Sequence, residues 1–243
     1  MGRTSLAPVL HFLRAHLGRS DSAISDENLL KRFAFQGNQA AFERIVERHG
    51  PLVWGVCRRV LHHQQDVEDA FQATFLVLVR KAHSIRRRAS LTSWLHGVAH
   101  RVALQARAGV QRNVLHELRE SATAGPDAAS EASYRELRAI VDQEILNLPE
   151  RFRTPLLLCC FEGRTKAVAA RELGWKEGTV ASRLARARQR LHSRLIRRGI
   201  ALAAAPAGLV FAEKSSAAVP AAVVTATVRM PMLFREKRRR LAD

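Results

Sequence analysis

The side chains of this chain that are best suited to chemistry are arginines spaced along one predicted helix. After Gly174, the sequence alternates between apolar and basic positions. The apolar positions recur at three- and four-residue steps and would face inward, at Val180, Leu184, Ala187, Leu191 and Leu195. The opposite face carries small polar residues and then arginines, at Thr179, Ser182, Arg183, Arg186, Arg190 and Arg194. Arginine binds phosphates and the edges of guanine bases, so this helix is predicted to read DNA.

A shorter helix precedes the arginine-bearing helix and completes a helix-turn-helix. Residues 167–173 place Val168, Ala169 and Leu173 on one apolar face, and Gly174 supplies the left-handed residue that commonly ends a helix. A tight turn over residues 175–178 would follow. In such a motif the second helix inserts its first turns into the major groove. A solvated basic helix on an ordinary bundle is the alternative interpretation, and the glycine turn favours the DNA-reading one.

The composition also favours a nucleic-acid partner. The 243 residues contain 40 lysines and arginines against 22 aspartates and glutamates, a formal charge of +18. The three cysteines, Cys57, Cys159 and Cys160, lie in apolar stretches, and two of them are adjacent. This arrangement fits neither a disulfide framework nor a zinc site, and it favours a reducing cytoplasm. The N-terminus lacks the apolar run of a secretory signal.

The chain divides at clusters of turn-forming residues. No alternating strand pattern precedes residue 200, so we expect an all-α fold with two helical modules joined by a flexible linker. Gly50 and Pro51 are read as the end of one helix and the start of the next. The expected divisions are an N-terminal extension (1–25), a first module (26–111), a linker (112–133), a second module (134–199) and a tail that is apolar and then basic (200–243).

The first module contains an acidic helix start followed by a basic loop. Asp66, Glu68 and Asp69 crowd the first turn of a helix whose buried stripe is formed by Val67, Phe71, Phe75, Leu78 and Val79. These acids either cap the helix or contact a basic surface of a partner protein. Arg86, Arg87 and Arg88 follow, before a helix that begins near Trp94 and exposes Arg101. Positive charge beside an aromatic ring suits single-stranded DNA.

An enzyme is the less favoured class. His96 and His100 stand four residues apart on a helix, but the pattern is not HExxH and a third metal ligand is not evident. Such a pair is typical of packing or surface histidines, so we expect no metal site, no cofactor and no catalytic residue. The sequence also lacks the phosphate loop GxxxxGK[ST]. A helix-turn-helix regulator that acts without binding polymerase is the second functional class.

Four segments together resemble the sigma-70 superfamily. Region 2 of that family is similar to DVEDAFQATF at 66–75 and to WLHGVAHRVA at 94–103. Region 4 is similar to LPERFR at 148–153 and to GTVASRLARAR at 178–188. The linker leaves no room for region 3, and the chain before residue 26 is too short for the acidic first region of a housekeeping factor. The resemblance is therefore to the extracytoplasmic-function (ECF) group of sigma factors.

This resemblance implies partners and roles for particular residues. It implies binding to core RNA polymerase, at the clamp helices of the largest subunit and the flap of the second, and to promoter DNA, with no small-molecule substrate. An anti-sigma factor is a further candidate partner. The polymerase-binding residues would be Asp66, Glu68, Asp69 and Gln72. The melted −10 element would be held by Arg86, Arg87, Arg88, Trp94 and Arg101. The −35 element would be read by Thr179, Ser182, Arg183, Arg186 and Arg190.

The tail has two alanine- and valine-rich stretches, 200–212 and 217–228, each shorter than the ~20 residues that span a bilayer. They are too apolar for a plain linker. We expect the tail to pack against the second module, where it would mask part of the arginine face, or to lie on a membrane surface with the help of the basic cluster at 235–240.

Overall fold

The computed structural model describes residues 24–85, 90–117, 137, 139–200 and 219–240, with the side chains of 110–117 and 232–240 left undescribed. Within these ranges the chain is helical and has no strand, which confirms the expected all-α class. The N-terminal extension before residue 24, most of the predicted linker and the first part of the tail lie outside the described residues. No helix in the described ranges is long and apolar enough to cross a membrane.

The first module consists of four helices and a short 3-10 turn. They are α2 (Asp26–Gln36), α3 (Gln39–Val60), α4 (Gln64–Lys81), η1 (Ala82–Ser84) and α5 (Leu91–Glu117). Local capping sets the first boundaries, since the Ser25 side chain accepts a hydrogen bond from the Asn28 amide at 3.3 Å. Gly37 ends α2 in the left-handed conformation with a φ of 64°, and Asn38 caps α3.

Aromatic rings fill the centre of the first module. Phe42, Phe71 and Phe75 are fully buried, and the ring centroids of Phe71 and Phe75 are 5.0 Å apart. The Trp54 ring meets Phe71 edge-on at 5.6 Å. The stripe predicted for residues 67–79 is confirmed, with Val79 half-buried and the other members buried. This core fixes α4 with its acidic first turn at one end.

The prediction that a helix ends at Gly50 and another starts at Pro51 is wrong. Helix α3 runs without interruption from Gln39 to Val60 and contains both residues. A proline inside a helix removes one backbone hydrogen bond and normally costs about 3 kcal/mol. Here Val46 and Val53, on either side of the pair, are anchored in the core of the first module. Tertiary packing therefore outweighs the local preference, as it often does for buried helices.

The second module begins with a helical stretch over residues 139–146 and continues through α7 (Glu150–Leu156), the π-helical turn η2 (Leu157–Phe161), α8 (Lys166–Leu173) and α9 (Glu177–Arg197). Its main core is built from residues of the first helices, among them Ile145, Phe152 and Leu156, packed against the inner stripe of α9. A smaller core holds α8 against the start of α9 through Ala169, Ala170 and Val180.

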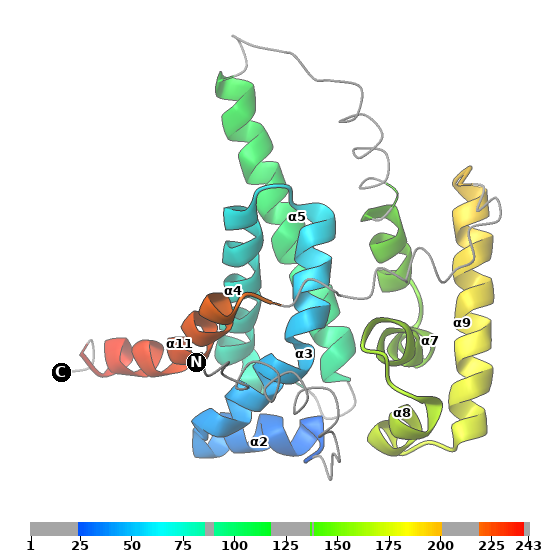
Figure 1. The fold of residues 1–243 in the computed structure, drawn as a ribbon, viewed down its shortest axis with the longest axis horizontal. Coiled ribbons are helices and arrows are strands. Elements are labelled where there is room, and N and C mark those ends of the chain that lie inside the picture. Colours follow the sequence, from blue (N-terminus) through cyan, green and yellow to red (C-terminus); the bar gives the residue numbers. More distant parts are fainter. Residues whose placement is uncertain (1–23, 86–89, 118–136, 138, 201–218, 241–243) are drawn as a thin grey trace, which may run out of the picture.

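The two modules pack against each other. Leu52 of α3 is 2% exposed and belongs to the core of the second module, and α5 contacts both α7 and η2. Figure 1 shows the second module beside α3 and α5. Helix α5 continues to Glu117, past residue 112, where the sequence predicts the linker to begin. The linker pattern in the sequence gave no indication of this contact between modules.

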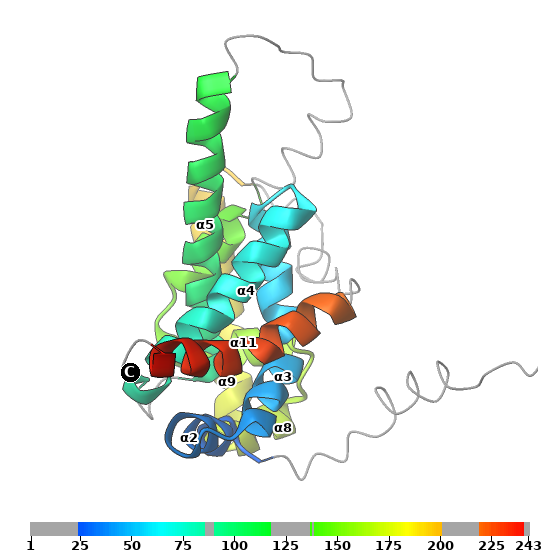
Figure 2. The ribbon, with the colours of Figure 1, turned by 90° about the vertical axis from the view of Figure 1, so that its left-hand side faces the viewer.

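The tail contains a helix in an unexpected place. Helix α11 (Ala221–Arg240) crosses α3 and α4 of the first module (Figure 2). Helix α11 therefore does not mask the arginine face of the second module, as the sequence predicted for the tail, while residues 201–218 lie outside the described residues. The physical reason is that α3 and α4 leave an apolar surface on which Val223 becomes buried. Arg186 and Arg190 of α9, by contrast, remain exposed.

Candidate nucleic-acid interface

Local sequence builds the helix-turn-helix that presents the predicted DNA-reading residues. The Thr165 hydroxyl accepts a hydrogen bond from the Val168 amide at 3.2 Å and so caps α8. Gly174 ends α8 with a φ of 64°, and its N–H points to the carbonyls of Ala170 and Arg171. Helix α9 begins at Glu177. Its buried residues are those predicted from the sequence, namely Val180, Leu184, Ala187, Leu191 and Leu195.

The outer face of α9 brings the predicted −35 residues together. Ser182, Arg186 and Arg190 are exposed, and Thr179 and Arg183 are half-buried. The Ser182 hydroxyl donates to the Thr179 carbonyl at 3.1 Å, which leaves its oxygen able to accept a hydrogen bond from an outside group. All five residues thus share one surface, open from the first turn of the helix onward.

Two of these arginines rest on aromatic rings. The guanidinium of Arg183 lies over the Trp175 ring, 4.1 Å from its centroid. The guanidinium of Arg190 lies over the Phe152 ring at 4.5 Å. Such cation–π contacts are worth about 0.5–1 kcal/mol at exposed sites, and they restrict the side-chain conformations. Arg183 is therefore held beside the turn between the two helices.

The basic face of α9 does not continue with equal strength to its C-terminus. Glu144, from the helical stretch 139–146, pairs with Arg194 at 3.3 Å and with Arg198 at 2.6 Å. Its side chain is 6% exposed, so these two arginines are tied to the second module itself. The residues left to face a phosphate backbone are concentrated in the first three to four turns of α9.

The predicted polymerase-binding residues lie in the first turns of α4. Asp69 is exposed, and Asp66, Glu68 and Gln72 are half-buried. Glu68 accepts a hydrogen bond from the Gln64 amide at 2.8 Å, and Asp69 accepts one from the Gln65 amide at 3.3 Å. Glutamine is uncharged, so these contacts orient the carboxylates without neutralising them. The structure thus places the four residues close together at one end of the first module.

The predicted single-strand surface is divided. Arg86, Arg87 and Arg88 lie outside the described residues. Trp94 is half-buried and Arg101 is exposed, both on α5. The first turn of α5 is covered by the second module, so that Thr92 and Ser93 are 0% and 3% exposed.

Hydrogen bonds between modules hold this cover in place. The hydroxyl oxygens of Ser93 and Thr154 are 2.8 Å apart, and the Ser90 amide donates to the Glu150 carboxylate at 3.1 Å. Thr154 and Glu150 both belong to α7. Helix α7 of the second module therefore lies on the start of α5.

A buried ion pair between α3 and the second module reinforces the contact between the modules. Arg59 of α3 donates two hydrogen bonds to the Asp142 carboxylate, at 2.6 and 3.0 Å, and His96 Nε2 lies 3.3 Å from the same group. Burial alone would raise the pKa of Asp142, but the charge of Arg59 and the hydrogen bonds from His96 and Arg59 hold that pKa well below its usual range. Burial lowers the pKa of His96, so its imidazole is neutral and donates from Nε2.

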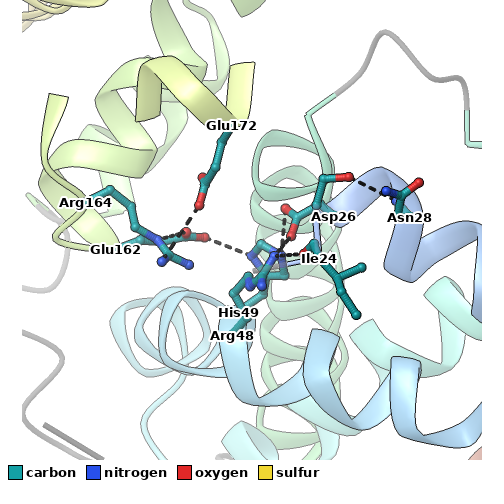
Figure 3. A network of polar contacts seen from close by, with 9 residues as sticks. Ile24, Asp26, Asn28, Arg48, His49, Glu162, Arg164 and Glu172 are labelled. Atoms are coloured by element: carbon teal, nitrogen blue, oxygen red, sulfur yellow. Dashed lines mark hydrogen bonds and ion pairs between the residues drawn. The ribbon is translucent and has the colours of Figure 1, made fainter. Parts of the chain in front are cut away.

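A second polar network joins the modules around His49 (Figure 3). The His49 side chain is 0% exposed and lies between two carboxylates, Asp26 at 3.0 Å and Glu162 at 2.9 Å. Burial would lower the pKa of His49, but the two negative charges outweigh it and raise that pKa to about 10. His49 is therefore an imidazolium at neutral pH. Arg48 adds a 2.6 Å contact to Asp26, and Arg164 lies 3.6 Å from Glu162.

Sequence reasoning missed both networks. The pair His96 and His100 was expected to be packing or surface histidines, and the structure buries both of them. Asp142 and Glu162 gave no local signal, because each finds its partner in the other module. Among the described residues no group of three or more His, Cys, Asp or Glu side chains is placed to hold a metal ion.

Comparisons with known proteins identify both modules. Residues 45–113 match the family model Sigma-70 region 2, and residues 138–191 match Sigma-70, region 4. The ECF RNA polymerase sigma factor SigM of Mycobacterium tuberculosis (strain ATCC 25618 / H37Rv) is 31% identical over 167 residues, which cover 69% of this chain and 83% of that protein. The RNA polymerase sigma-H factor of Pseudomonas aeruginosa is 30% identical over 182 residues, covering 70% and 93%.

A solved structure of CnrH in complex with the cytosolic domain of CnrY is also similar, at 23% identity over 71% of this chain and 97% of that one. Its TM-score of 0.35 is too low to carry any conclusion. The two family models and the sequence relatives decide the question, because region 2 matches the first module, region 4 matches the second, and the relatives are matched over 83% and 93% of their length. A regulator with a helix-turn-helix alone would not match region 2. The chain belongs to the sigma-70 superfamily, within the ECF group of RNA polymerase sigma factors.

Proposed function

We propose that this chain directs core RNA polymerase to promoters through three separate surfaces, one on each of α4, α5 and α9. The observation that carries the proposal is the exposed arginine face of α9 on a helix-turn-helix, combined with acids on α4 that form no ion pair within the described part of the chain. The first is suited to duplex DNA and the second to a basic protein surface.

The α9 surface would read the −35 element. Thr179, Ser182 and Arg183 lie at the start of the helix, where a recognition helix contacts base edges, and Arg186 and Arg190 follow on the same face. An arginine that bonds both acceptors of a guanine contributes about 1–3 kcal/mol of discrimination. Which base each residue contacts depends on the promoter sequence.

The α4 surface would dock on the clamp helices of the largest polymerase subunit. Asp66, Glu68, Asp69 and Gln72 form the contact. Complementary charge across such an interface raises the association rate and fixes the orientation of the two proteins. The second module would meet the flap of the second subunit, which would place the two DNA-binding surfaces on one polymerase.

The α5 surface would hold the unpaired −10 strand, with Trp94 as the ring beside the bases and Arg101 and the 86–88 arginines along the backbone. Because α7 lies on the start of α5, this surface becomes accessible when the modules separate. The chain would open DNA without hydrolysing a nucleotide: captured bases and polymerase contacts would supply the free energy. The covalent connection makes the second DNA contact effectively intramolecular.

The site of action would be the cytoplasm, where polymerase and promoters are found. An anti-sigma factor would be an additional partner that keeps the polymerase-binding surface occupied. It would compete with core polymerase and not with duplex DNA if it covers α4.

A charge reversal tests the polymerase-binding role. Asp69→Arg places a like charge against a basic partner, so we expect core binding to weaken at least about tenfold. Glu47→Arg is the matched control, since its side chain is 50% exposed on α3 of the same module. Affinity for core polymerase is measured by fluorescence titration, and circular dichroism melts verify the fold. Equal core affinity of the folded Asp69→Arg and Glu47→Arg proteins would refute the assignment.

A further inference from the structure

Helix α11 occupies a groove formed by α3 and α4. Its inner face consists of Val223, Thr227 and Pro231, which are buried, flanked by half-buried valines. Its outer face, formed by Ala221, Ala222, Thr225, Ala226 and Arg229, is exposed. The Thr227 hydroxyl donates to the carbonyl of Val223 in its own helix, so it is buried without needing a partner in the groove. The contact is thus that of an amphipathic helix in an apolar groove.

Two contacts fix where α11 lies along α3. Near its start, a Cβ built on Gly50 would lie 3.7 Å from Val219 and 3.7 Å from the Phe71 ring, so both side chains cover this glycine. Nine residues later, the Gln39 side-chain amide donates to the carbonyl of Val228. Helix α11 therefore runs from the middle of α3 back toward its N-terminus, and it begins beside Phe71 of α4.

The core of the first module is nearly complete without this helix. Val223 is the single α11 residue among the buried members of that core, whereas α3 and α4 supply most of the others. Among the described side chains, α11 makes no salt bridge to the groove. Its attachment rests on Val223 and the half-buried valines, on Thr227, Met230 and Pro231, and on one side-chain hydrogen bond. The helix is docked on the module rather than built into it.

The position of α11 bears on polymerase binding. Phe71 directly precedes Gln72 and stands one turn after Glu68, two residues of the proposed polymerase-binding surface. A partner that docks along α4 would therefore reach the start of α11 within about one helical turn, or 5.4 Å. We propose that the α3–α4 groove is a helix-docking surface whose resident ligand is α11, and that α11 must be displaced for core polymerase to bind with full affinity. This inference rests on the proposed function of α4.

The test uses the full chain with one substitution on each face of α11. Val223→Asp places a charge in the apolar groove, and Ala222→Asp places the same charge on the exposed face. Hydrogen exchange of the α11 amides reports docking, and titration with core polymerase reports affinity. We expect Val223→Asp to speed exchange in α11 and to tighten core binding at least about fivefold, because a larger fraction of molecules is competent to bind. Ala222→Asp should change neither.

Two milder variants cover the case in which Val223→Asp does not fold. Val223→Ala shortens the buried side chain, and Gln39→Ala removes the hydrogen bond to the α11 backbone. Both variants should speed hydrogen exchange in α11 and tighten core binding, by smaller factors than Val223→Asp. The proposal is overturned if α11 exchange rises while core affinity stays the same or weakens. It is equally overturned if none of these variants raises exchange above that of Ala222→Asp.

Failure of the tail proposal can be distinguished from failure of the α4 assignment. If Asp69→Arg weakens core binding while Val223→Asp leaves it unchanged, the acids are correctly assigned and the tail is not a regulator. If Val223→Asp tightens binding and Asp69→Arg has no effect, the tail controls docking at a surface other than the α4 acids.

Discussion

The two proposed DNA-binding surfaces differ in how the chain presents them. The face of α9 with Arg186 and Arg190 is exposed and is supported by contacts within its own module. At the start of α5, Thr92 and Ser93 are buried and Trp94 is half-buried, and the other module covers this turn through α7. We infer that the duplex-reading surface is ready in the free chain, whereas the single-strand surface requires the modules to separate. The ion pairs between modules then set the cost of that separation.

The largest expected effect comes from breaking the buried pair between modules. Asp142→Ala leaves the Arg59 guanidinium without its carboxylate, and removing one partner of a buried ion pair costs about 3–5 kcal/mol. We expect the free energy of unfolding to fall by that amount in urea titrations, and the amides at the start of α5 to exchange faster.

Gln143→Ala is the control for this change, because the Gln143 side chain donates to Asn147 at an exposed position. A loss below about 1 kcal/mol in Asp142→Ala, the range of an exposed pair, would mean that this contact does not hold the modules together.

A second substitution addresses the exposed surface. Arg186→Ala should weaken binding to an upstream promoter duplex by about 1–3 kcal/mol, since it removes a guanidinium from the reading face. Arg188→Ala is the matched control, because Arg188 is also exposed on α9 but points toward Cys160, 3.5 Å away. Gel-shift titrations measure both. Equal duplex affinities for the two arginine variants would show that α9 reads DNA with a different face.

Trp94→Ala should leave duplex binding unchanged and reduce promoter melting in permanganate footprints.

A further prediction concerns the pH dependence of stability. The pKa of His49 is raised from 6.5 to about 10 by Asp26 and Glu162, so its charged form stabilises the folded state. That contribution is complete below pH 6.5 and is lost as the pH rises toward 10, with a slope of at most about 1.4 kcal/mol per pH unit.

We expect the free energy of unfolding to decline from pH 7 to pH 9.5, and the decline to be shallower in His49→Gln. Urea titrations at each pH measure it. Identical slopes in the two proteins would show that His49 is not charged between its two carboxylates.

The sequence predicted best what local contacts decide. The α8–α9 motif, its glycine turn and the buried stripe of α9 all follow from helix periodicity and capping, and the structure confirms them. The same holds for the stripe of α4. The predicted helix break at Gly50–Pro51 failed because buried residues on both sides keep α3 intact.

Contacts between segments that are distant in the chain could not be predicted from the sequence. Asp142 pairs with Arg59 across 83 positions of sequence, and Glu162 pairs with His49 across 113. No sequence periodicity links the two members of such a pair. A histidine on an apolar helix face is therefore interpreted from sequence as a packing residue. The groove that receives α11 is formed by α3 and α4 together, and the sequence of neither helix indicates that it leaves an apolar surface for another helix. The apolar character of helix α11 was therefore recognised, but the helix was assigned to the wrong surface.

A reversible cross-link between modules tests the central comparison most directly. The hydroxyls of Ser93 and Thr154 are 2.8 Å apart, which brings their Cβ atoms near the separation that a disulfide needs. The double variant Ser93→Cys, Thr154→Cys, once oxidised, would hold α7 on the start of α5. Ser93→Cys alone, oxidised in the same way, controls for the three native cysteines.

The measurement is permanganate footprinting of a promoter with core polymerase, before and after reduction, alongside duplex binding by the same protein. We expect the oxidised double variant to bind the upstream duplex normally and to leave the −10 element closed, and reduction to restore melting. If the oxidised protein melts the promoter as well as the reduced one, the start of α5 does not need to be uncovered, and the difference between the two surfaces has no functional meaning.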